Sequence, residues 1–242
     1  MPQIPISAQP RGTGKLRKSQ MNNLEKLKSQ GLRSEDVLGT IGPFKIFLGS
    51  LEALLGPFEL PDEVMDALFY IISRSQPGTE PINSQAMRLI LEGSSRARST
   101  YFFKKNLKGA SAVFGPYLVG ECHWTLFHCN LKEGTIMYID SLGEQPQRCS
   151  QIIENWSLFA ASRGCQGPWK LINRDHDLQK DSVSCGVFSI MTTSALRPET
   201  VDTLLSKRTE KYDFCPETRR FTCPQTTLWE TMVSALGADK TK

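Results

Sequence analysis

Two strand-like segments near the middle of the chain constrain its fold more than any other feature. Residues 123–129 and 135–140 both have the pattern of strands, and only residues 130–134 separate them. That connection is of hairpin length and contains Gly134, which suits a tight turn. The pattern predicts a hairpin at the centre of the fold.

Helical patterns surround this hairpin. After Pro61, apolar residues recur at helical spacing from Val64 to Ile72. The proline and the acidic residues that follow it suit a first turn, where the helix dipole favours negative charge. The segments predicted to be helical are 61–75, 150–164, 187–196 and 227–237. Further short strands are expected from Phe44 and at 169–173. This mixture of helices and strands predicts an α+β fold.

The first 40 residues differ in character from the rest of the chain. They are rich in Gly, Pro, Gln, Ser and Lys and show no sustained periodicity beyond a short stretch from Leu24 to Leu27. Residues 1–34 contain seven Lys or Arg against one Glu, a net charge of +6, so the rest of the +4 chain carries −2. We expect a disordered basic tail over 1–40 and a folded domain over 41–242. The tail is either a solvated leader or a contact for nucleic acid, an acidic protein or an import receptor.

The composition indicates a globular protein that works inside a cell. Apolar residues make up 39% of the chain, enough for a core, yet no apolar run approaches the ~20 residues that span a bilayer. The N-terminus lacks the apolar stretch of a secretory signal. Seven cysteines with irregular spacing and no CxxC pair argue against a disulfide framework. We expect a monomer in the nucleus or cytoplasm, without membrane contact.

One of those cysteines has the setting of a nucleophile. A thiol reacts as its thiolate, and a neighbouring imidazole or a helix N-terminus promotes loss of the proton. Cys185 follows the polar residues 181–184 and leads directly into the apolar segment 187–196. It is therefore expected at the N-terminus of a buried helix, with Ser182 or Ser184 as the cap. No other cysteine in the sequence has such a setting.

Three histidines are candidates for the base: His123, His128 and His176. His123 begins the first strand of the predicted hairpin, and His128 lies five positions further on, so the two rings point to opposite faces. This offset, with a spacing that matches no common zinc pattern, argues against a metal site with Cys122 and Cys129. His176 is interpreted as a surface loop residue. We take His123 as the base and expect no metal and no cofactor.

An orienting carboxylate and an oxyanion donor complete such a site. Asp140 is the first candidate for the carboxylate, because it ends the second hairpin strand, across the turn from the histidine strand. Asp175 and Asp177 are alternatives in a loop whose geometry the sequence leaves open. Acyl transfer also needs hydrogen-bond donors for the developing oxyanion. The backbone NH of Cys185 and the side-chain amide of Gln179 are the candidates.

Four short blocks, in their chain order, resemble the signature of the ubiquitin-like-protein protease (Ulp/SENP) family. They are Leu60-Pro61-Asp62-Glu63-Val64, His123-Trp124, Tyr138-Ile139-Asp140-Ser141-Leu142, and Gln179 followed by Ser184-Cys185-Gly186-Val187-Phe188. The family shows W-L-N-D-E-V, H-W, D-S-L and Q-x5-C-G at the corresponding places. The likeness covers roughly residues 44–196. It implies a cysteine-peptidase fold with a central mixed sheet and the nucleophile at the N-terminus of a buried helix.

The resemblance also implies roles for individual residues. The catalytic residues that it implies are His123, Asp140 and Cys185 as a triad and Gln179 at the oxyanion hole. Trp124 is implied as a lid over the Gly-Gly end of a modifier, and Asp62 and Phe58 become candidate substrate-binding residues. Glu59 stands where the family carries a second tryptophan of the Gly-Gly tunnel, a role that Phe58 is placed to fill. Ser184 replaces the usual Asp before the cysteine.

The sequence therefore predicts a cysteine-type isopeptidase or processing protease that cleaves after Gly-Gly of SUMO or a related ubiquitin-like modifier. The modifier and its conjugates are the expected partners. Three alternatives remain open. The altered tunnel block also fits a peptide endoprotease of viral or transposon type. The intact triad argues against a module that binds the modifier without cutting it, and an acyltransferase on a related scaffold would usually carry Glu in place of Asp140.

Overall fold

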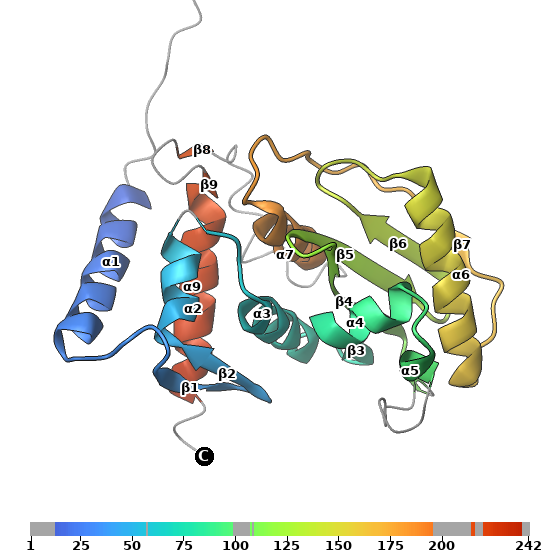
Figure 1. Cartoon of the computed structure of the whole chain (residues 1–242), viewed down its shortest axis with the longest axis horizontal. Coiled ribbons are helices and arrows are strands. Elements are labelled where there is room, and N and C mark those ends of the chain that lie inside the picture. Colours follow the sequence, from blue (N-terminus) through green and yellow to red (C-terminus); the bar gives the residue numbers. More distant parts are fainter. Residues whose placement is uncertain are drawn as a thin grey trace, which may run out of the picture.

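The computed structural model describes residues 13–56, 58–98, 107, 109–195, 214–215 and 220–238. A five-stranded sheet lies at its centre in the order β3-β4-β5-β6-β7 (Figure 1). Its strands are Thr79–Pro81 (β3), Ala112–Val119 (β4), His123–Asn130 (β5), Thr135–Ile139 (β6) and Lys170–Leu171 (β7). The three middle strands are antiparallel, whereas β3 and β7 pair with their neighbours in parallel. The predicted α+β fold with a central mixed sheet is confirmed.

Strands β5 and β6 form the hairpin that the sequence predicts. Their register pairs Leu126 with Ile139 and Asn130 with Thr135. Gly134 takes a positive φ of 65° in the turn, a conformation that few other residues adopt without strain. Asp140 therefore leaves β6 close to the start of β5, where His123 lies.

Strand β4 was not predicted, and Pro116 in its middle is the reason. Proline cannot donate to a strand ladder, so a proline normally argues against a central strand. Here β3 pairs with β4 over residues 112–114 alone, so the missing NH of Pro116 leaves no bond to β3 unmade. The first residues of β4 therefore lie between β3 and β5, whereas its remaining residues pair with β5 alone and form an edge of the sheet.

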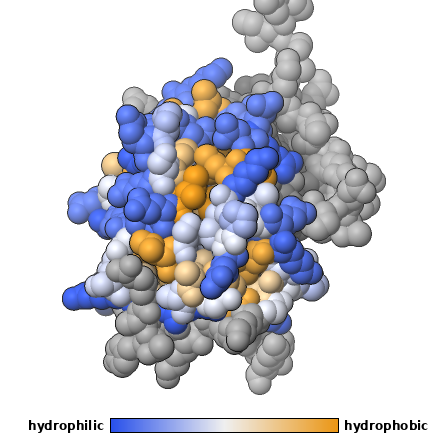
Figure 2. Space-filling model, turned by 90° about the vertical axis from the view of Figure 1, so that its right-hand side faces the viewer, coloured by the Kyte–Doolittle hydropathy of each residue, from blue (hydrophilic) through white to orange (hydrophobic). Residues whose placement is uncertain are grey.

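Different helices cover the two faces of the sheet. Asp62–Arg74 (α3) and Cys185–Ala195 (α7) contribute to the core that contains Trp124 and Leu126 of β5. Ser84–Leu91 (α4) and Pro146–Ser162 (α6), with the short Ser95–Arg98 (α5) beside them, contribute to the core that contains Phe127 and Cys129. Side chains alternate between the faces along a strand, so β5 supplies both cores. Figure 2 views the molecule from the side of α6, where apolar areas lie among hydrophilic side chains.

A second group of elements packs at the far side of α3. It comprises Thr13–Ser29 (α1), Val37–Ile41 (β1), Phe44–Phe47 (β2), Leu48–Leu55 (α2) and Thr222–Ala238 (α9), with the strands Phe214–Cys215 (β8) and Arg220–Phe221 (β9) nearby. Helices α1, α2 and α9 lie side by side although α9 is far from the others in sequence (Figure 1). Leu228, Trp229 and Met232 of α9 are buried in the same core as α3.

The disorder predicted for residues 1–40 is wrong for the part that the structure describes. Residues 13–29 form α1, whose Leu24 is buried. Lys28 Nζ also lies 2.7 Å from Glu52 Oε1 of α2. The partners of α1 come from α2 and from distant α9, so no local periodicity reveals its buried face. Residues 1–12 lie outside the described residues.

The helices predicted from apolar periodicity all overlap helices of the structure. They correspond to α3, α6, α7 and α9. Among the described residues, no helix combines the length and the apolar character needed to cross a bilayer.

Candidate active site

The ends of regular elements bring the predicted nucleophile, base and acid together. Cys185 is the first residue of α7, and His123 is the first residue of β5, against which α7 packs. Asp140 follows β6 directly. Cys185 carries a free thiol and is 1% exposed, so the sulfur sits within the protein rather than on its surface.

His123 and Asp140 form a short contact. His123 Nε2 lies 2.6 Å from Asp140 Oδ1. The same carboxylate accepts the backbone NH of Leu142 at 2.9 Å and the hydroxyl of Tyr138 at 3.3 Å. Burial opposes the charge on Asp140, but the hydrogen bonds from His123 and Leu142 outweigh it and lower the pKa of the carboxyl. Asp140 therefore stays ionised beside the imidazole, whereas Asp175 and Asp177 are exposed.

The other side of the imidazole faces the thiol. Nε2 of His123 is taken up by Asp140, so Nδ1 is the ring nitrogen left for Cys185. Burial alone would lower the pKa of His123, but hydrogen bonds and charge interactions with Asp140 and Cys185 raise it to about 9. An imidazole with that pKa is protonated at neutral pH.

The start of α7 is held by Asp181 rather than by the serines that the sequence suggested. One carboxylate oxygen of Asp181 accepts the backbone NH groups of Val183 and Ser184, at 2.9 and 2.7 Å. The other accepts the hydroxyl of Ser184 at 2.7 Å. Ser184 is fully buried and donates to this carboxylate, so its side chain does not serve as a helix cap. The carboxylate fixes the loop that presents Cys185 at the helix N-terminus.

Gly186 allows α7 to lie against the segment that precedes α3. A Cβ at this position would lie 3.0 Å from Met65 Sδ and 3.2 Å from Leu60 Cδ1. A side chain here would therefore require Met65 and Leu60 to shift by a few tenths of an ångström, so glycine allows the tightest packing next to Cys185. The close approach also places Leu60 against Gly186, the residue after Cys185.

Gln179 lies in a polar cluster that ties two loops together. Its Nε2 donates to the backbone carbonyl of Asp181 at 2.7 Å, and its Oε1 accepts the hydroxyl of Ser141 at 2.5 Å. Its backbone NH donates to the carbonyl of Ser141 at 2.9 Å. Gln179 and Ser141 are 8% and 4% exposed. Sequence reasoning assigned no role to Ser141, because its bonds to Gln179 join two loops that are distant in sequence. It also passed over Asp181, whose bonds to Val183 and Ser184 are local and of a kind that Asp commonly makes in turns.

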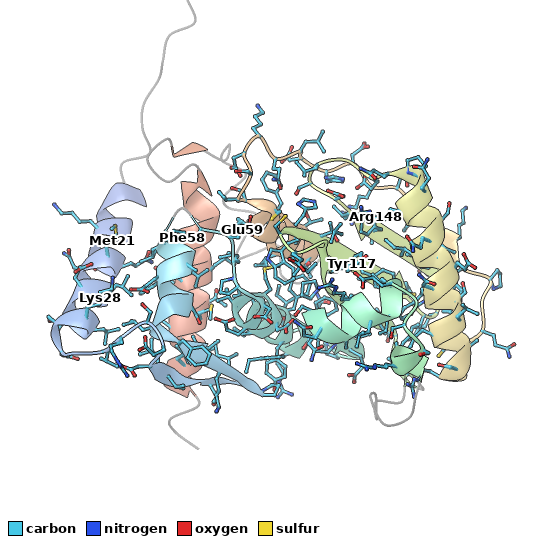
Figure 3. The ribbon with its side chains drawn as sticks, in the orientation of Figure 1. Met21, Lys28, Phe58, Glu59, Tyr117 and Arg148 are labelled. Atoms are coloured by element: carbon cyan, nitrogen blue, oxygen red, sulfur yellow. The ribbon has the colours of Figure 1, made fainter. Side chains whose placement is uncertain are left out.

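The predicted substrate-binding residues occupy different environments. Trp124 is buried in the core, and its Nε1 donates to the carbonyl of Leu60 at 2.7 Å, so its ring does not form an exposed lid. Phe58 is 61% exposed on the segment between α2 and α3, next to Glu59 (Figure 3). Asp62 is exposed at the first turn of α3 and accepts the backbone NH of Glu63.

The remaining histidines lie outside this cluster. Burial, with a smaller contribution from Arg174, lowers the pKa of His128 to about 4, so that ring is neutral. His176 was expected to be a simple surface residue, but its Nε2 lies 2.6 Å from Glu144 Oε1. Among the described residues, no group of three or more His, Cys, Asp or Glu side chains has the arrangement of a metal site.

Comparison with known sequences gives two matches. A model of the Ulp1 protease family, C-terminal catalytic domain, matches residues 79–213, a range that contains His123, Asp140, Gln179 and Cys185. Ubiquitin-like-specific protease 1 of Saccharomyces cerevisiae is 24% identical over 140 residues. That alignment covers 55% of this chain but 22% of the yeast protein.

Solved structures share the fold along most of the chain. The SUMO protease Ulp1 with its catalytic cysteine oxidised to a sulfenic acid has a TM-score of 0.67 at 19% identity, covering 97% of this chain and 98% of that one. The Ulp1 protease domain in complex with SMT3, the yeast orthologue of SUMO, has a TM-score of 0.65 at 20% identity, covering 96% and 98%. The Chaetomium thermophilum Ulp1-like SUMO protease catalytic domain has a TM-score of 0.61 at 16% identity, covering 91% and 89%.

Proposed function

This chain belongs to the Ulp1 protease family, and we propose that it is an intracellular cysteine peptidase that cleaves after the Gly-Gly end of SUMO or a related ubiquitin-like modifier. The observation that carries the proposal is the 2.6 Å contact between His123 and Asp140, together with the interaction with Cys185 that helps to raise the pKa of the imidazole. This is the arrangement that a thiol nucleophile needs, since the base is within reach and is itself oriented by a third group.

The chemistry follows from the positions of these groups. The Cys185 thiolate attacks the carbonyl carbon of the terminal glycine, and negative charge develops on the carbonyl oxygen. The backbone NH of Cys185 and Nε2 of Gln179 are the donors for that oxyanion. The His123 imidazolium then gives its proton to the departing amine as the C–N bond breaks, which leaves a thioester. Neutral His123 next takes a proton from water, whose oxygen attacks the thioester and releases the modifier and the thiolate.

Asp140 acts through the imidazole. Its carboxylate holds Nε2–H in place and stabilises the imidazolium, and it stays ionised throughout. The hydrogen bonds from Leu142 and Tyr138 hold the carboxylate in turn, so the orientation of the base is set by a buried network.

Two features support a Gly-Gly substrate. The fold matches a protease domain solved with SMT3 along nearly the whole chain. Trp124 and Leu60 also pack in the same core cluster as Cys185, and the indole NH is bonded to the Leu60 carbonyl. A tail without side chains fits a narrow slot that excludes larger residues. Glu59 in place of an aromatic residue leaves this slot looser, so some tolerance of Ala-Gly is expected.

A panel of ubiquitin-like modifiers, each joined through its C-terminal glycine to a fluorophore, tests the proposal. We expect release from SUMO or a close relative, no release by the Cys185→Ser variant, and weaker release from an Ala-Gly version of the same modifier. Release from an unrelated peptide but from no Gly-Gly modifier would favour the endoprotease alternative. Tight binding of a modifier without any release would favour a binding module.

A further inference from the structure

Two loops meet beside Cys185 and are joined by hydrogen bonds. One loop follows β6 and begins with Asp140 and Ser141; the other precedes α7 and contains His176 and Gln179. Ser141 bonds to Gln179 through both its hydroxyl and its carbonyl, and His176 Nε2 contacts Glu144 Oε1. Glu144 Oε1 also accepts the backbone NH of Asp140 at 3.1 Å. The acid and the oxyanion donor therefore lie on loops that are fastened to each other.

A side-chain amide has two different ends, and its partners decide which way it points. The oxygen is an acceptor and the nitrogen carries two donors. In Gln179 the oxygen receives the Ser141 hydroxyl at 2.5 Å, and the nitrogen donates to the Asp181 carbonyl at 2.7 Å. One N–H of the amide remains for a substrate oxygen. A flipped amide would set its oxygen against the Asp181 carbonyl, where neither atom has a proton to donate.

We propose that Ser141 is a positioning residue that orients the Gln179 amide so that Nε2 serves as an oxyanion donor. The proposal rests on the function proposed above, since it takes Gln179 as that donor. Ser141 acts through Gln179 and does not touch the reacting atoms. Because Ser141 directly follows Asp140, one loop sets the orientation of both the imidazole partner and the oxyanion donor.

Burial makes this contact consequential. Ser141 and Gln179 are 4% and 8% exposed, so water does not readily replace the hydroxyl. Without it, the amide oxygen is left buried and unpaired, which favours displacement of the whole amide. A donor that is displaced from the developing charge no longer stabilises it at full strength, since such stabilisation depends on orientation before the reaction.

Steady-state kinetics on a Gly-Gly modifier–fluorophore compare Ser141→Ala, Ser141→Thr and Ser73→Ala. Ser73 is the matched control, a buried serine whose hydroxyl donates to the Tyr70 carbonyl in α3. We expect Ser141→Ala to lower kcat about 10-fold with KM unchanged. Ser141→Thr keeps the hydroxyl and should regain most of the loss, and Ser73→Ala should leave kcat unaltered. Equal losses in Ser141→Ala and Ser73→Ala would overturn the proposal.

A double-mutant cycle separates a positioning role from a structural one. Gln179→Ala alone should lower kcat by roughly 10–10³. If Ser141 acts through Gln179, Ser141→Ala has no further effect in that background. A full additional loss in the double variant would show that Ser141 supports the fold in another way. Unchanged kcat in Gln179→Ala would instead remove Gln179 as a donor while the peptidase activity stands.

The amide orientation is also read without turnover, from the side-chain NH₂ resonances of Gln179 in an NMR spectrum of the folded chain. Gln179→Ala identifies the pair by its loss. We expect the two resonances to shift in Ser141→Ala, to stay near wild-type positions in Ser141→Thr, and to be unaffected in Ser73→Ala. Resonances that are the same in wild type and Ser141→Ala would overturn the proposal, whatever the protein is found to cleave.

Discussion

The catalytic cluster and the 58–60 segment beside it are built in contrasting ways. The carboxylate of Asp140 has three hydrogen-bonding partners, and Cys185 is buried at the start of a helix. By contrast, Phe58 and Glu59 are exposed, and the segment is fixed chiefly through Leu60 behind them. Under the function proposed above, the groups that do the chemistry are held by several buried bonds at once, whereas the surface proposed to meet the substrate has fewer such bonds. Substitutions in the first region should therefore affect turnover, and those in the second should affect selection.

Cys185→Ser should have the largest effect on turnover. It should abolish cleavage while binding of the modifier persists. A serine hydroxyl does not form an anion at neutral pH as a thiol does. Release of fluorophore and binding of the unlabelled modifier are measured on the same preparation. Cys149→Ser, a buried cysteine in α6, is the control and should stay active. Full activity in Cys185→Ser, with iodoacetamide labelling another cysteine first, would contradict the assignment of the nucleophile.

Asp140→Asn should lower kcat by about 10²–10⁴ with the fold retained, because an amide cannot hold the imidazolium as a carboxylate does. His123→Ala should be at least as damaging. Thermal unfolding checks the fold and single-turnover kinetics give the rate. Asp177→Asn is the matched exposed control. Should Asp177→Asn be damaging and Asp140→Asn silent, the acid has been assigned to the wrong loop.

Trp124→Ala should weaken turnover by about 2 kcal/mol or more, roughly 30-fold, since a buried aromatic wall is lost. Trp124→Phe keeps a ring but loses the bond to the Leu60 carbonyl, so its effect should be intermediate. Comparing Gly-Gly and Ala-Gly substrates shows whether the ring selects or merely packs. An equal loss of turnover on both substrates, together with a lower unfolding temperature, would show that Trp124 stabilises the core and does not select the substrate.

The pH profile should show an alkaline limb near 9, the pKa of His123. Burial lowers this pKa, but the interactions with Asp140 and Cys185 raise it by more than burial lowers it. The folded protein therefore stabilises the imidazolium. The imidazolium persists below pH 9 and is lost as the pH rises through 9. Above pH 9, kcat/KM should therefore fall about 10-fold per pH unit. In Asp140→Asn the limb should move to lower pH. A limb unmoved by that substitution would mean that another group titrates.

Glu59→Trp should have the smallest effect and the most selective one. A larger aromatic side chain on the segment should narrow the slot, so cleavage of Ala-Gly is expected to fall by up to about 10-fold while Gly-Gly stays within about twofold. The ratio of kcat/KM for the two substrates is the measurement. Glu121→Trp, at an exposed turn before β5, controls for a general effect of the new ring. Equal changes on both substrates would show that Glu59 does not face the slot.

Local patterns predict the parts of this molecule in which one segment carries the signal. The β5–β6 hairpin and helices α3, α6 and α7 show periods of apolar residues that depend on their own sequences. The order of the short blocks along the chain is enough to point to His123, Asp140 and Cys185. Features that depend on distant partners are missed. The buried face of α1 exists because α9 covers it, and β4 tolerates Pro116 because β3 is short.

Two finer contacts of the site were also missed, for different reasons. The bond from the Ser141 hydroxyl to Gln179 joins residues 38 positions apart. Asp181, rather than a serine, holds the start of α7, because the loop turns its carboxylate back onto the following NH groups. Neither contact leaves a repeating pattern in the sequence. The first depends on the three-dimensional arrangement of two loops, whereas the second is a local turn that the sequence analysis passed over in favour of the serines.

Gly186 has a consequence for how proteins of this fold diverge. Any larger residue at this position would require the side chains of Leu60 and Met65 to shift, whether or not the neighbouring thiol does chemistry. A descendant that lost catalysis would be free to exchange Cys185, His123 or Asp140, yet packing would still favour the glycine. Retention of that glycine in a distant homologue therefore records inheritance of the helix packing, and says nothing of whether the homologue still cuts.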